Sequence, residues 1–156
     1  MAAKISIGKK VPAFSRAVSG GKNWKSADAA GKKLVVYFYP KDNTTGCTKE
    51  GEAFRDLYPA FKKAGVQIVG VSPDSVASHE KFSEKFAFPF ELLADEDRSL
   101  CALFDVYKEK SMYGRKYMGV ERSTFLIDAA GVLRQEWRKV KVPGHAEAVL
   151  AAAKAL

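Results

Sequence analysis

The chain has 156 residues, of which 47% are hydrophobic and 28% charged, a balance typical of a globular domain and not of a disordered or fibrous protein. At this length one domain over residues 1–156 is expected, with a sizeable hydrophobic core. No apolar stretch approaches the roughly 20 residues that a membrane-spanning helix needs, and the N-terminal residues lack the apolar region of a secretory signal.

The formal net charge of +8 raises the question of an anionic partner. Lysine and arginine are spread along the chain and form no basic tail. A solvated basic surface is therefore expected, and neither a nucleic acid nor a membrane is predicted as a partner. Two cysteines in a chain of this length do not make a disulfide scaffold. They are typical of a reducing compartment, so a cytoplasmic location is expected.

The first half of the chain alternates predicted strands and helices. Residues 33–40, KLVVYFYP, form a continuous apolar run typical of a strand buried on both faces. Residues 47–65 carry apolar side chains at helical spacing, with a kink or short break expected at Pro59. A second buried strand is predicted over residues 66–74 and an amphipathic helix over residues 75–86.

The second half adds three further elements and a hairpin. A short strand is predicted over residues 90–95 and a helix over residues 96–106. Residues 123–137 contain two strand-like runs on either side of a turn at Gly131, a pattern typical of a hairpin. Residues 144–156 form an alanine-rich terminal helix. Together the elements predict an α/β fold, with a central mixed sheet flanked by helices and a short N-terminal extension.

A polar loop joins the first predicted strand to Cys47 within YFYPKDNTTGCTKE, residues 37–50. Sites in α/β folds are commonly built at the carboxyl ends of strands, as this loop is. A thiol in the first turn of a helix faces free backbone N–H groups and the positive end of the helix dipole. Such positions favour the thiolate, which is the nucleophilic form. Cys47 is therefore predicted to be a reactive thiolate, and Gly46 before it leaves room for a substrate.

Residues 40–47, PKDNTTGC, match the Pro-x-x-x-Thr-x-x-Cys signature of the peroxiredoxins, and residues 37–50 resemble the bacterioferritin comigratory protein, or PrxQ, branch of that family. The resemblance extends over nearly the whole chain through SPDSVASHEKF, LLADEDRSLCALFDVY, YGRKYMGVERSTFLID and WRKVKVPGHAEAVL. It implies a thioredoxin-like fold and an antioxidant enzyme that reduces hydroperoxides and requires neither a metal nor another cofactor.

By motif, the resemblance implies a catalytic set made of Cys47, Thr44, Pro40 and Arg122, with Pro40, Thr44, Gly46 and Arg122 binding the peroxide. The guanidinium of Arg122 is always charged and forked, so it can hold a thiolate and a peroxide oxygen together. The Cys47 thiolate would attack the terminal peroxide oxygen, release an alcohol or water, and become a sulfenic acid.

Reduction of that sulfenic acid is where the chain departs from the family pattern. Many relatives carry a second, resolving cysteine five residues after the first, where this chain has Glu52, and others carry it in the next helix, at a position aligned with Ser83. We therefore expect a one-cysteine cycle in which thioredoxin, or glutaredoxin with glutathione, supplies the thiol. A two-cysteine cycle with Cys101 is the alternative, although a buried cysteine more often acts as a small hydrophobe.

Other functions would use the same residues differently. A peroxide sensor or a holdase-type binding protein would oxidise Cys47 without rapid turnover. A Cys-His hydrolase would need His79 or His145 beside Cys47. The two histidines lack the neighbours of a zinc site, so no metal is expected. The family resemblance implies a monomer, or at most a weak homodimer.

Overall fold

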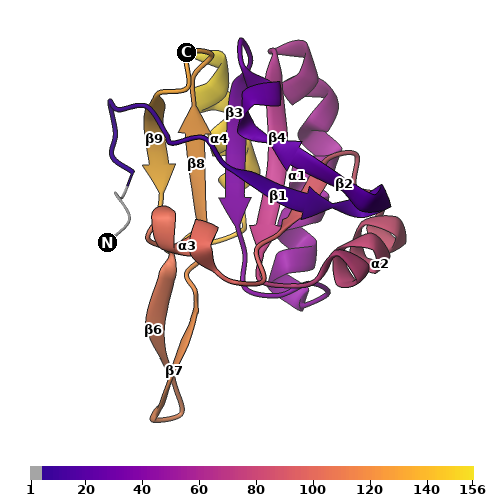
Figure 1. Cartoon of the computed structure of the whole chain (residues 1–156), viewed down its shortest axis with the longest axis vertical. Helices are drawn as coiled ribbons and strands as arrows, with labels where there is room; N and C mark the ends of the chain where they lie inside the picture. Colours follow the sequence, from indigo (N-terminus) through magenta and orange to yellow (C-terminus); the bar gives the residue numbers. More distant parts are fainter. Residues whose placement is uncertain (1–4) are drawn as a thin grey trace.

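A computed structural model describes residues 5–156 (Figure 1). The strands are β1 (Ser15–Val18), β2 (Lys22–Lys25), β3 (Lys33–Phe38), β4 (Val66–Ser72), β5 (Glu91–Ala94), β6 (Tyr107–Met112), β7 (Arg115–Val120), β8 (Ser123–Ile127) and β9 (Leu133–Trp137). The α-helices are α1 (Thr45–Lys63), α2 (Val76–Phe86), α3 (Ser99–Leu103) and α4 (His145–Lys154), and two short 3-10 helices span Ser19–Gly21 and Ser26–Ala29.

Seven strands form one mixed sheet in the order β2-β1-β5-β4-β3-β8-β9. Strands β3, β4 and β5 are parallel, because α1 and α2 carry the chain back between them. Strands β8 and β9 extend the sheet in antiparallel fashion on one side, and β1 pairs antiparallel with β5 on the other. The predicted α/β class, a mixed sheet flanked by helices, is confirmed.

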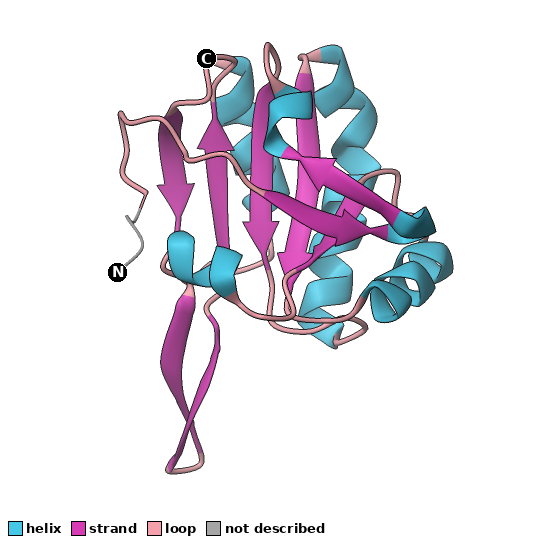
Figure 2. Cartoon of the chain, in the orientation of Figure 1, coloured by secondary structure: helices cyan, strands magenta, loops and turns pink. Residues whose placement is uncertain are grey.

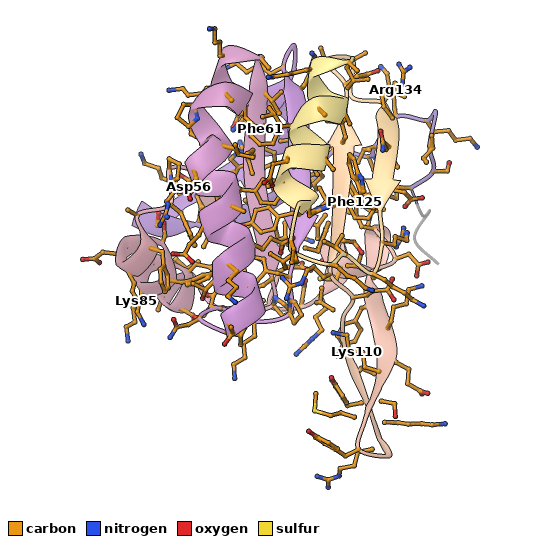
Figure 3. The ribbon with its side chains drawn as sticks, turned by 180° about the vertical axis from the view of Figure 1, so that it is seen from behind. Asp56, Phe61, Lys85, Lys110, Phe125 and Arg134 are labelled. Atoms are coloured by element: carbon orange, nitrogen blue, oxygen red, sulfur yellow. The ribbon has the colours of Figure 1, made fainter. Side chains whose placement is uncertain are left out.

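The sheet separates two hydrophobic clusters, because successive side chains of β3 point to opposite faces. Leu34, Val36 and Phe38 belong to one cluster, and Val35 and Tyr37 belong to the other. Helices α1 and α4 cover the second face, and both lie in front of the sheet when it is seen from behind (Figure 3). The two cysteines are divided in the same way, with Cys47 in the α1–α4 cluster and Cys101 in the cluster on the other face.

Several elements differ from those that the sequence predicts. Helix α1 runs unbroken over Thr45–Lys63, so the short break expected at Pro59 is wrong. Helix α3 is limited to Ser99–Leu103. The expected N-terminal extension contains the β1–β2 hairpin, which joins the sheet where Ala17 pairs with Ala94. Strands β6 and β7 form a separate hairpin that projects from the body of the molecule (Figure 2).

None of the helices among residues 5–156 has the length and apolar character needed to cross a membrane.

Candidate active site

The loop between β3 and α1 places Cys47 in the first turn of a helix. Thr44 is the N-cap residue with an extended backbone, and its carbonyl accepts the first helical hydrogen bond from the N–H of Thr48 at 2.8 Å. The N–H groups of residues 45–47 precede that bond and therefore have no acceptor within the helix. The side chain of Thr44 is exposed and does not cap α1, since its hydroxyl donates to the Lys41 carbonyl at 2.9 Å.

Arg122 is distant from Cys47 in the sequence but contacts it in the folded protein. It lies between β7 and β8, and because β8 pairs with β3 with Ser123 opposite Phe38, Arg122 is carried to the end of β3 where the cysteine loop begins. Its Nη2 lies 3.3 Å from Cys47 Sγ. Cys47 is only 2% exposed, so the guanidinium acts on the sulfur in a largely dehydrated setting, where a charge interacts more strongly than in water.

Gly46 permits this close approach. A Cβ atom at Gly46 would lie 3.1 Å from Arg122 Nη2, which is tighter than ordinary van der Waals contact. A larger residue would push the guanidinium away from the sulfur. The glycine was predicted to make room for a substrate, and the structure shows that it makes room for the arginine.

Pro40 directly follows Tyr39 after the end of β3 and is half-buried. With Lys41 it lines one side of a groove of about 370 Å³, whose other side is the base of the β6–β7 hairpin. Of the predicted site residues, Cys47, Gly46 and Arg122 are thus in direct proximity, while Thr44 and Pro40 flank them in the same loop.

Glu50 also belongs to this site, although no pattern in the sequence predicted it. It lies three residues after Cys47 on α1, is 1% exposed, and accepts a hydrogen bond on Oε1 from Arg122 Nη1 at 2.7 Å. Its other oxygen, Oε2, has no hydrogen-bond partner among residues 5–156. Glu50 thus fixes one arm of the guanidinium while the other arm faces the sulfur. Burial raises the pKa of the Glu50 carboxyl from 4.5 to about 7, although the charge of Arg122 opposes the rise.

This raised pKa predicts how stability depends on pH. Between about pH 4.5 and 7 the folded protein holds a proton on Glu50 that the unfolded chain has released, so the free energy of unfolding falls as pH rises through this window. The decline is up to about 3 kcal/mol and levels off above pH 7. Glu50→Gln should remove it, which urea denaturation at pH 5 and pH 8 can measure. Glu52→Gln is the matched control, and an unchanged pH slope in Glu50→Gln would contradict the assignment.

A buried polar network holds the cysteine loop against α2. Asp42 Oδ1 accepts from the Tyr39 hydroxyl at 2.6 Å, and Oδ2 accepts from Ser78 Oγ at 2.8 Å and lies 2.7 Å from His79 Nδ1. The backbone N–H of Asp42 donates to Asp74 Oδ2 at 2.8 Å. These contacts fix the loop that leads into Cys47, because Asp42 is bound from α2 and from the β4–α2 connection at once.

Ligand-type atoms of Asp42, Asp74 and His79 lie within 4.8 Å of one another. The atoms are already engaged in the hydrogen bonds described above, and His79 Nε2 lies 3.0 Å from the Leu93 carbonyl. A set of side chains that satisfy one another in this way is a structural network, and we assign no metal site to it.

The histidines do not form a Cys-His pair with Cys47. His79 is engaged by Asp42 and Leu93. His145 Nε2 faces Thr124 Oγ1 at 2.8 Å, and burial, with a smaller effect of the Arg122 charge, lowers the pKa of His145 to about 4. The nearest charged partner of the Cys47 sulfur is therefore Arg122, and the geometry does not favour a hydrolase.

Comparison with known proteins agrees with the geometry. Residues 7–136 match the AhpC/TSA family. Peroxiredoxin Bcp of Xanthomonas campestris is 56% identical over 138 residues, which are 88% of this chain and 86% of that protein.

Solved structures give the same result for the fold. A structure of peroxiredoxin Q from Xanthomonas campestris has a TM-score of 0.87 at 55% identity, covering 91% of this chain and 90% of that chain. A cysteine-to-serine variant of PrxQ from Xylella fastidiosa has a TM-score of 0.92 at 44% identity, covering 99% of this chain and 98% of that one. The thioredoxin-like fold is confirmed. The chain therefore belongs to the AhpC/TSA family as a peroxiredoxin of the Bcp, or PrxQ, branch, a family of thiol-dependent peroxidases.

Proposed function

We propose that Cys47 is the peroxidatic thiolate of this peroxidase and that it works through a one-cysteine cycle. The observation that carries the proposal is the 3.3 Å contact between Arg122 Nη2 and the buried Sγ of Cys47. A fixed positive charge at hydrogen-bond distance stabilises the thiolate over the thiol. The other guanidinium arm is held by Glu50, so the arginine cannot turn away from the sulfur without breaking a buried ion pair.

The first half of the cycle oxidises the sulfur. The Cys47 thiolate attacks the terminal oxygen of a hydroperoxide, an S–O bond forms as the O–O bond breaks, and the alkoxide or hydroxide takes a proton from water and leaves. Negative charge moves from sulfur to the leaving oxygen in this step. Arg122 lies within hydrogen-bond distance of the sulfur, and the first N–H groups of α1 have no acceptor within the helix. In this proposal, both supply donors for the charge that develops on the oxygen.

Thr44 and Pro40 have supporting roles in this proposal. The Thr44 hydroxyl, which in the free protein donates to the Lys41 carbonyl, can bind a peroxide oxygen at the mouth of the site. Pro40 has no N–H to offer water and limits access to the sulfur from the groove side.

The second half of the cycle needs a thiol from outside the chain. Cys101 is fully buried in the hydrophobic cluster on the opposite face of the sheet from Cys47. Burial raises the pKa of the Cys101 thiol, and nearby Asp95 raises it further, so this sulfur is not ionised near neutral pH. A disulfide between the two cysteines would require the chain to unfold extensively, because Cα atoms of a disulfide lie within roughly 7 Å.

Ser83 lies on α2, at the position that the family resemblance aligns with the resolving cysteine of some relatives. Two solved structures of the Xanthomonas campestris protein are cysteine-to-serine variants, and their two substituted cysteines have the same separation in that chain as Cys47 and Ser83 have here. This spacing supports the alignment of Ser83 with a cysteine of the relative. A serine there cannot form a disulfide, so an external thiol attacks the sulfenic sulfur, the S–O bond breaks, and water leaves as a mixed disulfide forms. A second thiol then attacks the partner sulfur and releases Cys47 as the thiolate.

The experiment uses one equivalent of hydrogen peroxide followed by mass spectrometry. The native chain should carry a sulfenic acid on Cys47 that dimedone traps, whereas Ser83→Cys should form a disulfide between Cys47 and the introduced cysteine. Steady-state turnover is then measured with thioredoxin and its reductase, with glutaredoxin and glutathione, and with dithiothreitol. A Cys47–Cys101 disulfide in the native chain would overturn the one-cysteine cycle. One round of oxidation without turnover with any thiol would support a sensor instead.

A further inference from the structure

The β6–β7 hairpin concentrates the exposed apolar side chains of the molecule. Six large hydrophobic residues are exposed among residues 5–156, and four of them lie on this hairpin: Tyr113 (98% exposed), Met112 (55%), Met118 (51%) and Tyr117 (43%). The hairpin projects from the body as a two-stranded sheet of its own (Figure 1). Apolar side chains gathered on a projecting element are more typical of an interaction site than of a solvated surface.

The same hairpin is cationic. Residues 107–120 include Lys108, Lys110, Arg115 and Lys116, against one acid, Glu109. Lys116 lies 3.9 Å from Glu109, and Lys108 is paired with Asp105 below the hairpin. Arg115 makes no ion pair with any residue of the described part of the chain. Tyrosine, methionine and arginine are enriched in protein interfaces, and the excess positive charge favours an acidic partner.

This surface is continuous with the candidate active site. Strand β7 ends at Val120, only two residues before Arg122, and the N–H of Glu121 donates to the Val106 carbonyl at 2.7 Å, which closes the base of the hairpin. The groove of about 370 Å³ joins the two regions, because its lining includes Pro40 and Lys41 of the cysteine loop and also Tyr117 and Met118 of β7.

Lys110 is on the side of the hairpin that faces the cysteine loop, because it lines the groove together with Pro40 and Lys41. Its side chain lines the groove, and burial lowers the pKa of its ammonium group, with the Arg122 charge acting in the same direction. The groove is also lined by Lys41 and Arg98, against one acid, Asp74. Asp74 Oδ2 already accepts from the Asp42 N–H and the Ser72 hydroxyl, so a ligand that covers the groove meets an excess of positive charge. A protein that brings a thiol to Cys47 by way of the groove would contact the hairpin.

We propose that the β6–β7 hairpin and the groove at its base are the docking surface for the protein dithiol that reduces oxidised Cys47. The proposal rests on the one-cysteine cycle, since a chain without a resolving cysteine depends on a partner for every turnover. The partner that fits is a thioredoxin-type protein whose reactive cysteine lies on an apolar surface bordered by acidic side chains. The apolar surface would cover Tyr117 and Met118, and the acidic border would face Lys110 and Arg115.

Docking must also expose a sulfur that is buried at rest. Cys47 is 2% exposed, so a protein thiol reaches it only when the first turn of α1 opens. That turn has no side-chain cap and no acidic residue, and its opening therefore costs less than the opening of a capped helix start.

The test compares two double charge reversals with the same change in net charge. Arg115→Glu/Lys116→Glu alters the hairpin, and Lys9→Glu/Lys10→Glu alters two exposed lysines beside the β8–β9 turn, at the other end of the sheet. Peroxide turnover is measured with thioredoxin, thioredoxin reductase and NADPH, and separately with dithiothreitol. The hairpin variant should lose about tenfold in kcat/KM for thioredoxin and keep its dithiothreitol rate, and the control should keep both.

An apolar variant, Tyr113→Ser/Met118→Ser, should show the same selective loss without any change in charge. Equal losses in the hairpin and control variants, or no loss in either, would overturn the proposal. So would a native protein that turns over with dithiothreitol but not with thioredoxin. Binding to vesicles of phosphatidylglycerol that the hairpin substitutions abolish, with thioredoxin kinetics unchanged, would reassign the surface to lipid. Absence of turnover with dithiothreitol would instead contradict the proposed function.

Discussion

Cys47→Ser is expected to abolish peroxide turnover, with a loss of roughly 10⁴-fold or more, as for the removal of other enzyme nucleophiles. The serine hydroxyl does not ionise near neutral pH, so the charge of Arg122 has no thiolate to stabilise. The protein should still fold, because serine and cysteine have side chains of the same shape and differ only in the oxygen that replaces the sulfur at the buried start of α1. The measurement is initial peroxide consumption with dithiothreitol at saturating concentration, together with urea denaturation of both proteins.

Cys101→Ser is the control for that experiment. Cys101 is also fully buried, but it lies on the opposite face of the sheet, with Asp95 accepting a hydrogen bond from its backbone N–H at 2.8 Å. Its replacement should change stability modestly and leave turnover intact. Undiminished activity in Cys47→Ser would remove the proposed mechanism, and a loss confined to Cys101→Ser would transfer the chemistry to the other cysteine.

Local patterns in the sequence predicted the central part of the fold. The apolar runs of β3 and β4, the helical spacing of α1 and α2, and the turn at Gly131 depend on neighbouring residues, and those elements are present as expected. The β6–β7 hairpin was missed because it is largely exposed on both faces, so its residues show no alternation between apolar and polar side chains. The four-residue strands β1 and β2 are too short for a pattern, and β1 is defined by its pairing with β5.

The residues of the site likewise differ in whether a local sequence pattern could predict them. Cys47 and Arg122 were predicted from motifs, but only the pairing of β3 with β8 explains why they meet. Glu50 gave a local signal, since residues three apart share a helix face. The spacing alone could not distinguish a buried Glu50 from a solvent-exposed glutamate, because the partner of the Glu50 carboxylate is an arginine 72 residues away. The Asp42–His79 contact likewise joins a loop to a helix that no local pattern connects.

Arg122→Ala is expected to lower kcat/KM for hydrogen peroxide by about 10²–10³-fold, as for the loss of a donor that stabilises developing charge. The sulfur should also react more slowly with other electrophiles, because it loses the donor that lies 3.3 Å away in the native protein. The rate of iodoacetamide labelling of Cys47 at a fixed pH measures that loss independently of peroxide. Labelling and turnover that both match the native protein would exclude Arg122 from the chemistry.

The variant has a structural cost that must be separated from the catalytic one. Without Arg122, the Glu50 carboxyl is buried with neither oxygen paired, and its pKa rises further above the native value of about 7. A raised folded-state pKa reduces stability as pH rises, so Arg122→Ala should be much less stable than the native chain at pH 8 and closer to it at pH 5.

The double variant Arg122→Met/Glu50→Gln resolves the two effects. It removes the guanidinium and the buried charge together, and methionine fills part of the space that the arginine stem occupied. Stability at pH 8 should recover toward the native value, whereas kcat/KM and the labelling rate of Cys47 should stay as impaired as in Arg122→Ala. Recovery of activity together with stability would mean that Arg122 only neutralises Glu50. If stability recovers and activity does not, the guanidinium takes part in the reaction. In that variant the buried charge of Glu50 is gone, and the only remaining defect is that the sulfur and the peroxide lack the Arg122 donor.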